Sequence, residues 1–338
     1  MPANPEKEKA FSKEHLSQCK GYDPTFIDGT TSIALNILSD TQKKKLPVVE
    51  GNAQGVLHYS RYSVLYNKSR RVPFVSAANI DGAKKIPLSR DGSFKPDPRV
   101  NAKHQLSDKF YDLVVGGETE FDIGHMTSNN EMCWSADARL YAYETFHFTN
   151  SVPQASKVNR GLWSGLEGYI VDEARAKKTN QKIAVFTGPV LKTKDPVYIN
   201  DETFQVPLLF WKVVVFKKKT GFHAAGFVMS HEKKLREMNL IKDKKKTGTH
   251  RDALAPDEDE LAFQDYPYKK VFQINIETIE KLTGLKLNWA NVARIAVHND
   301  KLQLKKLGTV TSAADAGNLR SVHNGAAKPV RQKLNMIL

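Results

Sequence analysis

The residues of this chain that could do chemistry lie mainly between Asp122 and Glu167. In the segment FDIGHMTSNN, Asp122 and His125 flank Gly124, which we expect at a tight turn. Histidine has an unperturbed pKa near neutrality, so His125 could accept a proton from water. The cluster alone is weak evidence, because a single histidine is more often structural than catalytic.

A second cluster follows in the segment NRGLWSGLEGY, at the start of a predicted helix over 157–176 that Ser156 could cap. Asn159 and Glu167 fall on roughly the same side of such a helix, and its first turn favours a phosphate. Amide and carboxylate oxygens are ligands that suit Mg²⁺. A base, a hard-cation site and a basic surface together predict phosphodiester hydrolysis.

The basic character of the chain favours a polyanionic partner. Its 338 residues include 51 Lys and Arg against 37 Asp and Glu, a net charge of +14. Charge alone leaves open a basic protein without an anionic partner. No apolar run is long enough to span a membrane, and the polar N-terminus lacks the layout of a signal peptide. We therefore expect no membrane partner, a cytoplasmic location with two reduced thiols, Cys19 and Cys133, and leave delivery into another cell open.

The pattern along the chain predicts a mixed α+β fold. Helices are expected over 11–20, 32–45, 136–145 and near 276–287, where Gly284 ends the last one. Segments rich in Val, Phe and Tyr predict strands, with central strands in KIAVFTGPVL, VPLLFWKVVVFKK and GFHAAGFVMS. We divide the chain into an N-terminal helical and polar segment (1–50), an endonuclease domain (51–290) and a basic C-terminal extension (291–338).

Several segments in order resemble blocks of the DNA/RNA non-specific endonucleases of the ββα-metal class. They run from residue 21 to 287: GYDPTFIDG, YSVLYNKSRRVPFVSAANIDG, DPRV, DIGHM, ETFHFTNSVPQ, NRGLWSGLEGYI, VFTGPVL and VPLLFWKVVV. The resemblance implies a ββα-metal core, with a central antiparallel sheet flanked by helices.

The resemblance also implies roles for four residues. His125 matches the general base that activates water, and Asn159 matches the sole direct protein ligand of the metal. Glu167 matches the catalytic acidic residue that holds metal-bound water. Asp122 begins the signature and is interpreted as a catalytic residue that orients its neighbours. The implied cofactor is Mg²⁺, for which Mn²⁺ could substitute.

One position departs from the family signature, because Ile123 stands where the family usually has arginine. An isoleucine cannot contact phosphate or stabilise developing charge. Arg99, Arg139 or Arg160 could supply the missing guanidinium, and we include all three as candidate substrate-binding residues. Asn150 matches a block that shapes the site beside the helix and is the fourth candidate.

The sequence thus predicts a sequence-non-specific endonuclease that acts on DNA and possibly RNA, leaving 5′-phosphate ends. One alternative is a catalytically weak or inactive nucleic-acid-binding member, since Ile123 breaks the signature. Another is an effector subunit of a larger protein complex. A nuclease in the cytoplasm would need restraint by a protein partner or inhibitor, which favours a role in antiviral defence or as a toxin. Homo-oligomers remain open.

Overall fold

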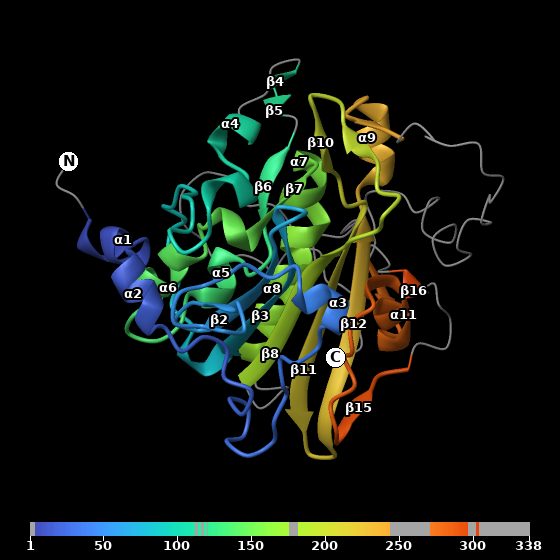
Figure 1. The fold of residues 1–338 in the computed structure, drawn as a ribbon. Coiled ribbons are helices and arrows are strands. Elements are labelled where there is room, and N and C mark those ends of the chain that lie inside the picture. The colour runs from blue at the N-terminus through green and yellow to red at the C-terminus, as the bar shows by residue number, and fades with distance from the viewer. Residues whose placement is uncertain are drawn as a thin grey trace, which may run out of the picture.

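A large sheet forms the centre of the protein in the computed structural model, which describes residues 4–111, 114–115, 118–119, 121–175, 182–243, 271–296 and 302–303 (Figure 1). Within these residues it has nine strands in the order β1-β2-β3-β8-β11-β12-β14-β16, and β15 also pairs with β12. Every pair is antiparallel except β12–β15. The strands are β1 (Leu57–His58), β2 (Tyr62–Asn67), β3 (Val72–Asp81), β8 (Lys182–Val190), β11 (Leu209–Lys218), β12 (Gly221–Ser230), β14 (Val271–Ile274), β15 (Val292–Arg294) and β16 (Leu302–Gln303).

The centre of this sheet is formed by β3, β8, β11 and β12, and the prediction of three central strands is confirmed. These strands are dense in Val, Phe and Ala and are buried along nearly their whole length, as strands covered on both faces must be. A polar exception is Lys212, which is fully buried in the middle of β11.

Three smaller strand pairings surround the sheet. They involve β4 (Val114–Val115) with β5 (Glu118–Thr119), β6 (Asp122–His125) with β7 (Ser151–Gln154), and β9 (Val197–Tyr198) with β10 (Asp201–Gln205) and β13 (Ile241–Lys242). Figure 1 shows β6 and β7 beside α7 and the upper end of α8. This group of strands and helices contains the candidate catalytic residues.

Helices cover both faces of the large sheet. One face carries α5 and α8, which contact β3, and the other carries α11, which contacts β12. No helix within the described ranges combines the length and the apolar character needed to cross a bilayer. The helices are α1 (Pro5–Ala10), α2 (Lys13–Gln18), α3 (Asp40–Lys43), η1 (Gly82–Lys84), η2 (Ala102–His104), α4 (Asp108–Tyr111), α5 (Asn129–Met132), α6 (Ala138–Glu144), η3 (Phe148–Asn150), α7 (Ser156–Val158), η4 (Asn159–Trp163), α8 (Ser164–Arg175), α9 (Glu232–Glu237) and α11 (Ile276–Thr283).

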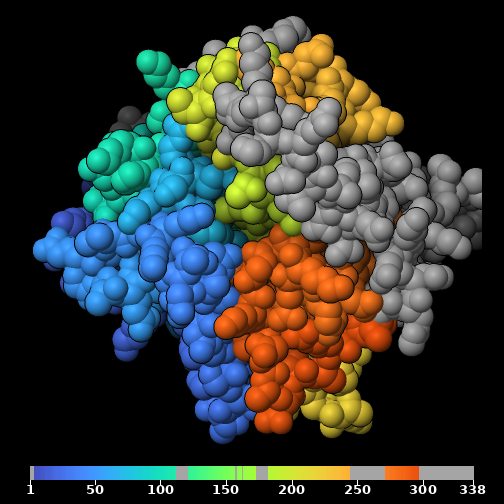
Figure 2. Space-filling view, turned by 45° about the vertical axis from the view of Figure 1, so that its right-hand side comes forward, coloured from blue at the N-terminus to red at the C-terminus, as the bar shows by residue number. Residues whose placement is uncertain are grey.

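The helix predicted over 32–45 is wrong apart from the single turn of α3. Ile33 and Ile37 have helical spacing, but both are buried in the apolar cluster on the α11 face of the sheet. The carbonyl of Ala34 accepts a hydrogen bond from Trp289, 2.8 Å away, and that of Ile37 accepts one from the Lys286 N–H at 2.8 Å. These carbonyls bind a distant segment instead of the next helical turn, and Figure 2 shows the two segments side by side.

Helices α1 and α2, at the start of the N-terminal segment, pack on the other side of the molecule, near α6 (Figure 1). The helix predicted over 11–20 is shorter than expected, because Ser12 caps α2 and a separate helix, α1, precedes it. The Asn4 side chain caps α1 and also donates a 3.0 Å hydrogen bond to the Tyr143 hydroxyl. The segment is therefore tied to the body of the protein by specific contacts.

Candidate active site

Strands β6 and β7 and the helix that follows them form a ββα unit. In the β6–β7 ladder Asp122 faces Gln154, and His125 faces Ser151. Chain direction then changes at Ala155, and α7 begins at the next residue. Because the helix starts directly after β7, its first residues lie beside β6, the strand of the predicted base. This arrangement agrees with the predicted ββα-metal core.

His125 is buried among aromatic rings, with 7% of the residue exposed. The rings of Phe94 and Phe146 lie 4.6 and 4.8 Å from the imidazole, centroid to centroid. Its Nε2 atom has no hydrogen-bond partner among the described residues. Burial lowers the pKa of His125 well below its usual 6.5, and the nearby Arg90 guanidinium lowers it further. The imidazole is therefore neutral near pH 7 and keeps a nitrogen available to accept a proton.

Gly124 is required for close packing and not for a turn, which corrects the expectation from sequence. It lies in the β6 ladder, and its φ is not positive. A Cβ atom at this position would lie 2.3 Å from Cδ of Gln154 on the neighbouring strand. Gln154 is itself fully buried, so it has little room to move away. Glycine thus leaves room for the Gln154 side chain of β7 beside the strand that ends in His125.

Asp122 connects β6 to the helix through three hydrogen bonds. Its carboxylate accepts from Asn159 Nδ2 at 3.0 Å and from Arg160 at 2.9 Å (Nε) and 2.6 Å (Nη2). A carboxylate can only accept here, so the donor end of the Asn159 amide faces Asp122, and its carbonyl oxygen faces away. Asp122 thus orients both Asn159 and the guanidinium of Arg160, whose side chain is 70% exposed. The orienting role predicted for Asp122 fits this geometry.

The helix that carries Asn159 is less regular than the sequence predicts. It begins with α7 at Ser156, whose side chain does not cap it, widens into the π-helical segment η4, and continues as α8. Gly161 has non-helical angles, with φ −103° and ψ −111°. The expectation that Asn159 and Glu167 share one side of a straight helix therefore fails at Gly161. Such π-helical turns are frequent at functional sites.

Glu167 lies over a buried charge cluster at the centre of the sheet. Lys212 Nζ is 2.9 Å from Glu131 Oε1 and 3.9 Å from Glu167 Oε1, and both Lys212 and Glu131 are fully buried. Glu167 Oε1 has no hydrogen-bond partner in the described chain. Burial raises the pKa of the Glu167 carboxyl, Glu131 raises it further, and the Lys212 ammonium acts in the opposite direction. A poorly solvated carboxylate oxygen is thus held beside the ββα unit.

Two charged residues of this site were not predicted from the sequence. Arg90, exposed in the loop before Phe94, acts electrostatically on both His125 and Glu167. Lys212 lies in the apolar middle of β11, where only its polarity within VPLLFWKVVVFKK could have marked it. Both residues are far from the motifs in sequence, and the fold brings their charges to the site.

The three other candidates make contacts within the protein, and their roles stay predictions. The guanidinium of Arg99 is buried and paired with Asp97 at 2.8 Å. Asn150 is fully buried and accepts from the Thr127 N–H at 3.0 Å, so it holds the chain just after His125. Arg139 is half-buried on α6, where its charge acts on Cys133.

Ile123, at the broken position of the signature, packs against the main apolar cluster. The arginine that the structure places on the Asp122 carboxylate is Arg160. Among the three arginines considered as replacements, Arg160 is therefore the one that the ββα unit contains. Arg90 adds a second positive charge from a separate loop.

The residues present fit a hard divalent cation. The Asn159 carbonyl oxygen faces away from its carboxylate partner, and Glu167 offers a buried oxygen without a hydrogen bond from the described residues. Amide and carboxylate oxygens are the donors that Mg²⁺ and Mn²⁺ prefer. Buried polar atoms are normally satisfied, so the unpaired atoms of His125 and Glu167 are each available to a ligand.

Comparison with known proteins agrees with this geometry. A sequence model of the family described as DNA/RNA non-specific endonuclease matches residues 41–294. The chain is 31% identical over 220 residues to a salivary endonuclease of Lutzomyia longipalpis, a match that covers 58% of this chain and 50% of the relative. It is 26% identical over 172 residues to the mitochondrial nuclease EXOG of Xenopus laevis, covering 48% and 45%.

Two further similarities complete the comparison. An uncharacterized protein of Sinorhizobium fredii is 32% identical over 193 residues, which cover 54% of this chain and 28% of that protein. This chain thus spans half or less of the length of these three relatives. A crystal structure of the EndoG/EndoGI complex, described as showing the mechanism of EndoG inhibition, matches with a TM-score of 0.50 and 23% identity. That match covers 70% of this chain and 86% of the other, and it confirms the α+β fold.

Proposed function

This chain belongs to the DNA/RNA non-specific endonuclease family, and we propose that it is a metal-dependent endonuclease with His125 as the general base. The observation that carries the proposal is the buried, unpaired Nε2 of His125, on the strand that Asp122 joins to the Asn159 helix. An imidazole held neutral by burial can take a proton from water near pH 7.

The side chains around His125 have distinct tasks in this proposal. Phe94 and Phe146 fix the plane of the imidazole and keep its surroundings poor in water. Arg160, steered by Asp122, and Arg90 place positive charge where the phosphate would lie. The proton taken by His125 would leave a hydroxide to attack phosphorus in line with the departing 3′ oxygen, which would give 5′-phosphate ends.

Asn159 would bind the metal through its carbonyl oxygen, and Glu167 would act on the ion through its solvent shell. When bound, Mg²⁺ or Mn²⁺ stabilises negative charge on the phosphate and on the leaving oxygen. Asp122 keeps the Asn159 amide turned so that its carbonyl is presented to the ion.

The proposed substrates are DNA and RNA without sequence preference. The net charge of +14 favours any polyphosphate, and contacts to phosphate carry no information about bases. The two exposed arginines of the site, Arg90 and Arg160, are suited to phosphate oxygens, which DNA and RNA share.

The test is cleavage of supercoiled plasmid and of a long RNA by the purified chain in Mg²⁺, Mn²⁺ or chelator. We expect cleavage in either metal, none in chelator, and a loss of about 10²- to 10⁴-fold on His125→Ala. His223→Ala, which removes an imidazole from the half-buried start of β12, serves as the matched control and should cleave normally. If the chain bound nucleic acid but did not cleave it in either metal, it would be a nucleic-acid-binding protein without catalytic activity.

We also propose that a protein partner restrains the enzyme, as expected of a nuclease that acts inside a cell in defence or as a toxin. The similar EndoG structure supports this proposal, because it is a complex with EndoGI that concerns the inhibition of EndoG. Expression of the chain should therefore be toxic unless His125 is replaced. Harmless expression of a chain that is fully active after purification would contradict restraint.

A further inference from the structure

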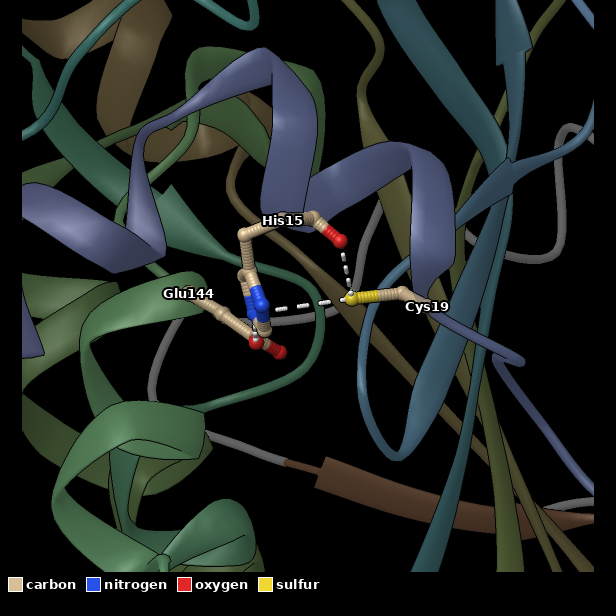
Figure 3. Close-up of side chains that lie close together, drawn as sticks. All are labelled: His15, Cys19 and Glu144. Atoms are coloured by element: carbon tan, nitrogen blue, oxygen red, sulfur yellow. Dashed lines mark hydrogen bonds and ion pairs between the residues drawn. The ribbon is translucent and has the colours of Figure 1, made fainter.

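A second cluster of metal-binding side chains lies away from the catalytic motifs, where α2 meets α6. His15 lies near the start of α2 and Cys19 is its C-cap, one helical turn later, and Glu144 is the last residue of α6 (Figure 3). His15 Nε2 lies 2.6 Å from Glu144 Oε1 and 3.6 Å from Cys19 Sγ. One ligand atom from each of the three residues lies within 4.8 Å of the other two.

We propose that His15, Cys19 and Glu144 bind a Zn²⁺ ion that fastens the N-terminal segment to the endonuclease fold. Thiolate and imidazole together select a borderline-soft ion such as zinc over Mg²⁺. The oxygen donors at Asn159 favour the opposite choice. The two sites would therefore take different metals.

The distances fit a tetrahedral zinc site with one adjustment. Zinc bonds of about 2.0 to 2.3 Å place neighbouring tetrahedral ligands roughly 3.3 to 3.6 Å apart. The separation between His15 Nε2 and Cys19 Sγ, 3.6 Å, already has this value. The separation of 2.6 Å between His15 Nε2 and Glu144 Oε1 is that of a hydrogen bond, and it must widen when an ion replaces the shared proton.

Glu144 is already held as a ligand should be. It is fully buried, and Ser60 donates to it twice, through its N–H at 2.7 Å and its hydroxyl at 2.6 Å. Such outer hydrogen bonds orient metal-binding carboxylates. A thiolate and a carboxylate would also neutralise the two positive charges of the ion, which lowers the cost of placing it in a buried location.

The cluster is open on the side of Cys19. Cys19 borders a pocket of about 950 Å³, which is also lined by Leu16, His58 and Arg99. A water molecule entering from this pocket would supply the fourth ligand that three-residue zinc sites take. The ion can reach the cluster by the same route.

The same three residues do not form a nucleophilic triad. In a triad the histidine uses one nitrogen for the acid and the other for the nucleophile. Here Nε2 of His15 faces both Glu144 and Cys19. Burial, with a further contribution from Glu144, raises the pKa of the Cys19 thiol to about 12, so no thiolate is available without a cation.

The position of the cluster in the chain gives the proposed ion its role. His15 and Cys19 precede the region matched by the family model, 41–294, whereas Glu144 lies inside it. An ion shared by these residues would cross-link the added N-terminal segment to the family fold. Its binding energy would then contribute directly to the stability of that attachment.

The test is cobalt and zinc binding by the full chain after chelator treatment. Co²⁺ should produce the thiolate-to-cobalt charge-transfer absorption in the near ultraviolet, and one equivalent of Zn²⁺ should abolish it. Zn²⁺ at about a hundred times its Kd should also raise the Tm by a few degrees. Sulfur charge transfer cannot arise at the oxygen donors of Asn159, so this readout is independent of nuclease activity.

Three variants decide the outcome. Cys19→Ser should lose the charge-transfer band and the zinc-induced shift in Tm, while its circular dichroism stays that of the folded protein. Cys133→Ser is the matched control and should keep both, because Cys133 donates to the Asn129 carbonyl at 3.1 Å outside this cluster. Asn159→Ala should also keep both. A folded wild-type chain without the band, or a band that survives Cys19→Ser, would overturn the proposal.

Discussion

Two candidate sites of the protein each include a histidine and a glutamate, and their hydrogen bonding differs. His15 and Glu144 contact each other directly at 2.6 Å, and Glu144 also accepts two hydrogen bonds from Ser60. His125 and Glu167 each keep a buried atom without a hydrogen-bond partner in the described chain. Residue types alone therefore do not set the chemistry of a site. Satisfied groups hold structure together, whereas unsatisfied groups are available to a substrate and its ion.

The largest effect is expected from the lysine beneath Glu167. Lys212→Met leaves the fully buried Glu131 without its cationic partner, so the free energy of unfolding should fall by about 3–5 kcal/mol. Lys217→Met on the same strand breaks the more exposed pair with Asp28 and should cost less than about 1 kcal/mol. Urea unfolding at pH 7 measures both. Equal losses of unfolding free energy in the two variants would show that Lys212 and its glutamate partner are not charged.

Replacing Glu144 or Glu167 by glutamine should affect different properties: stability in the first case and cleavage in the second. Glu144→Gln weakens charge-assisted hydrogen bonds and should cost about 1.5–3 kcal/mol of stability in metal-free buffer, with cleavage unchanged. Glu167→Gln should leave stability nearly unchanged but lower cleavage about 10- to 100-fold. Urea unfolding and plasmid cleavage are measured on both variants. If both variants lost only stability, or both lost only cleavage, the proposed difference between the two glutamates would be wrong.

The pH dependence tests the environment of His125. Because burial lowers its pKa, His125 stays neutral below pH 6.5, and kcat/KM should decline only at lower pH. The unfolded chain binds this proton more tightly, so the free energy of unfolding should fall as pH drops below 6.5. His125→Ala should lose less stability than the wild type between pH 7 and pH 5. A decline in kcat/KM centred at or above pH 6.5 would contradict the predicted shift.

The smallest effect is expected from restoring the family signature. Ile123→Arg should change kcat/KM by less than about tenfold, equivalent to about 1.4 kcal/mol, because Arg160 and Arg90 already supply positive charge. It should also reduce stability, since Ile123 packs against the apolar cluster. Plasmid cleavage rates of the Ile123→Arg and Arg160→Ala variants, compared with the wild type, test this prediction. A large gain in the Ile123 variant would show that these two arginines do not replace the missing one.

Local sequence pattern was enough to predict several elements and the core residues of the site. The central strands, the helix at 138–144 and the end of α11 at Gly284, with its φ of 68°, follow from composition, periodicity and backbone preference. The segments DIGHM and NRGLWSGLEGY led to the prediction of His125, Asn159 and Glu167 as a site, through their resemblance to blocks of the family. Their catalytic roles stay predictions.

Long-range packing determines which charges meet and which polar groups are satisfied. Lys212 contacts Glu131, 81 positions away in the sequence, and His15 contacts Glu144, 129 positions away. No local sequence pattern carries information over such separations. The apolar spacing of residues 33–38 resembled a helix, although the segment forms no helix, packs in the cluster on the α11 face and bonds to residues near 289. Local preferences are worth tenths of a kcal/mol per residue, and burial against a large sheet outweighs them.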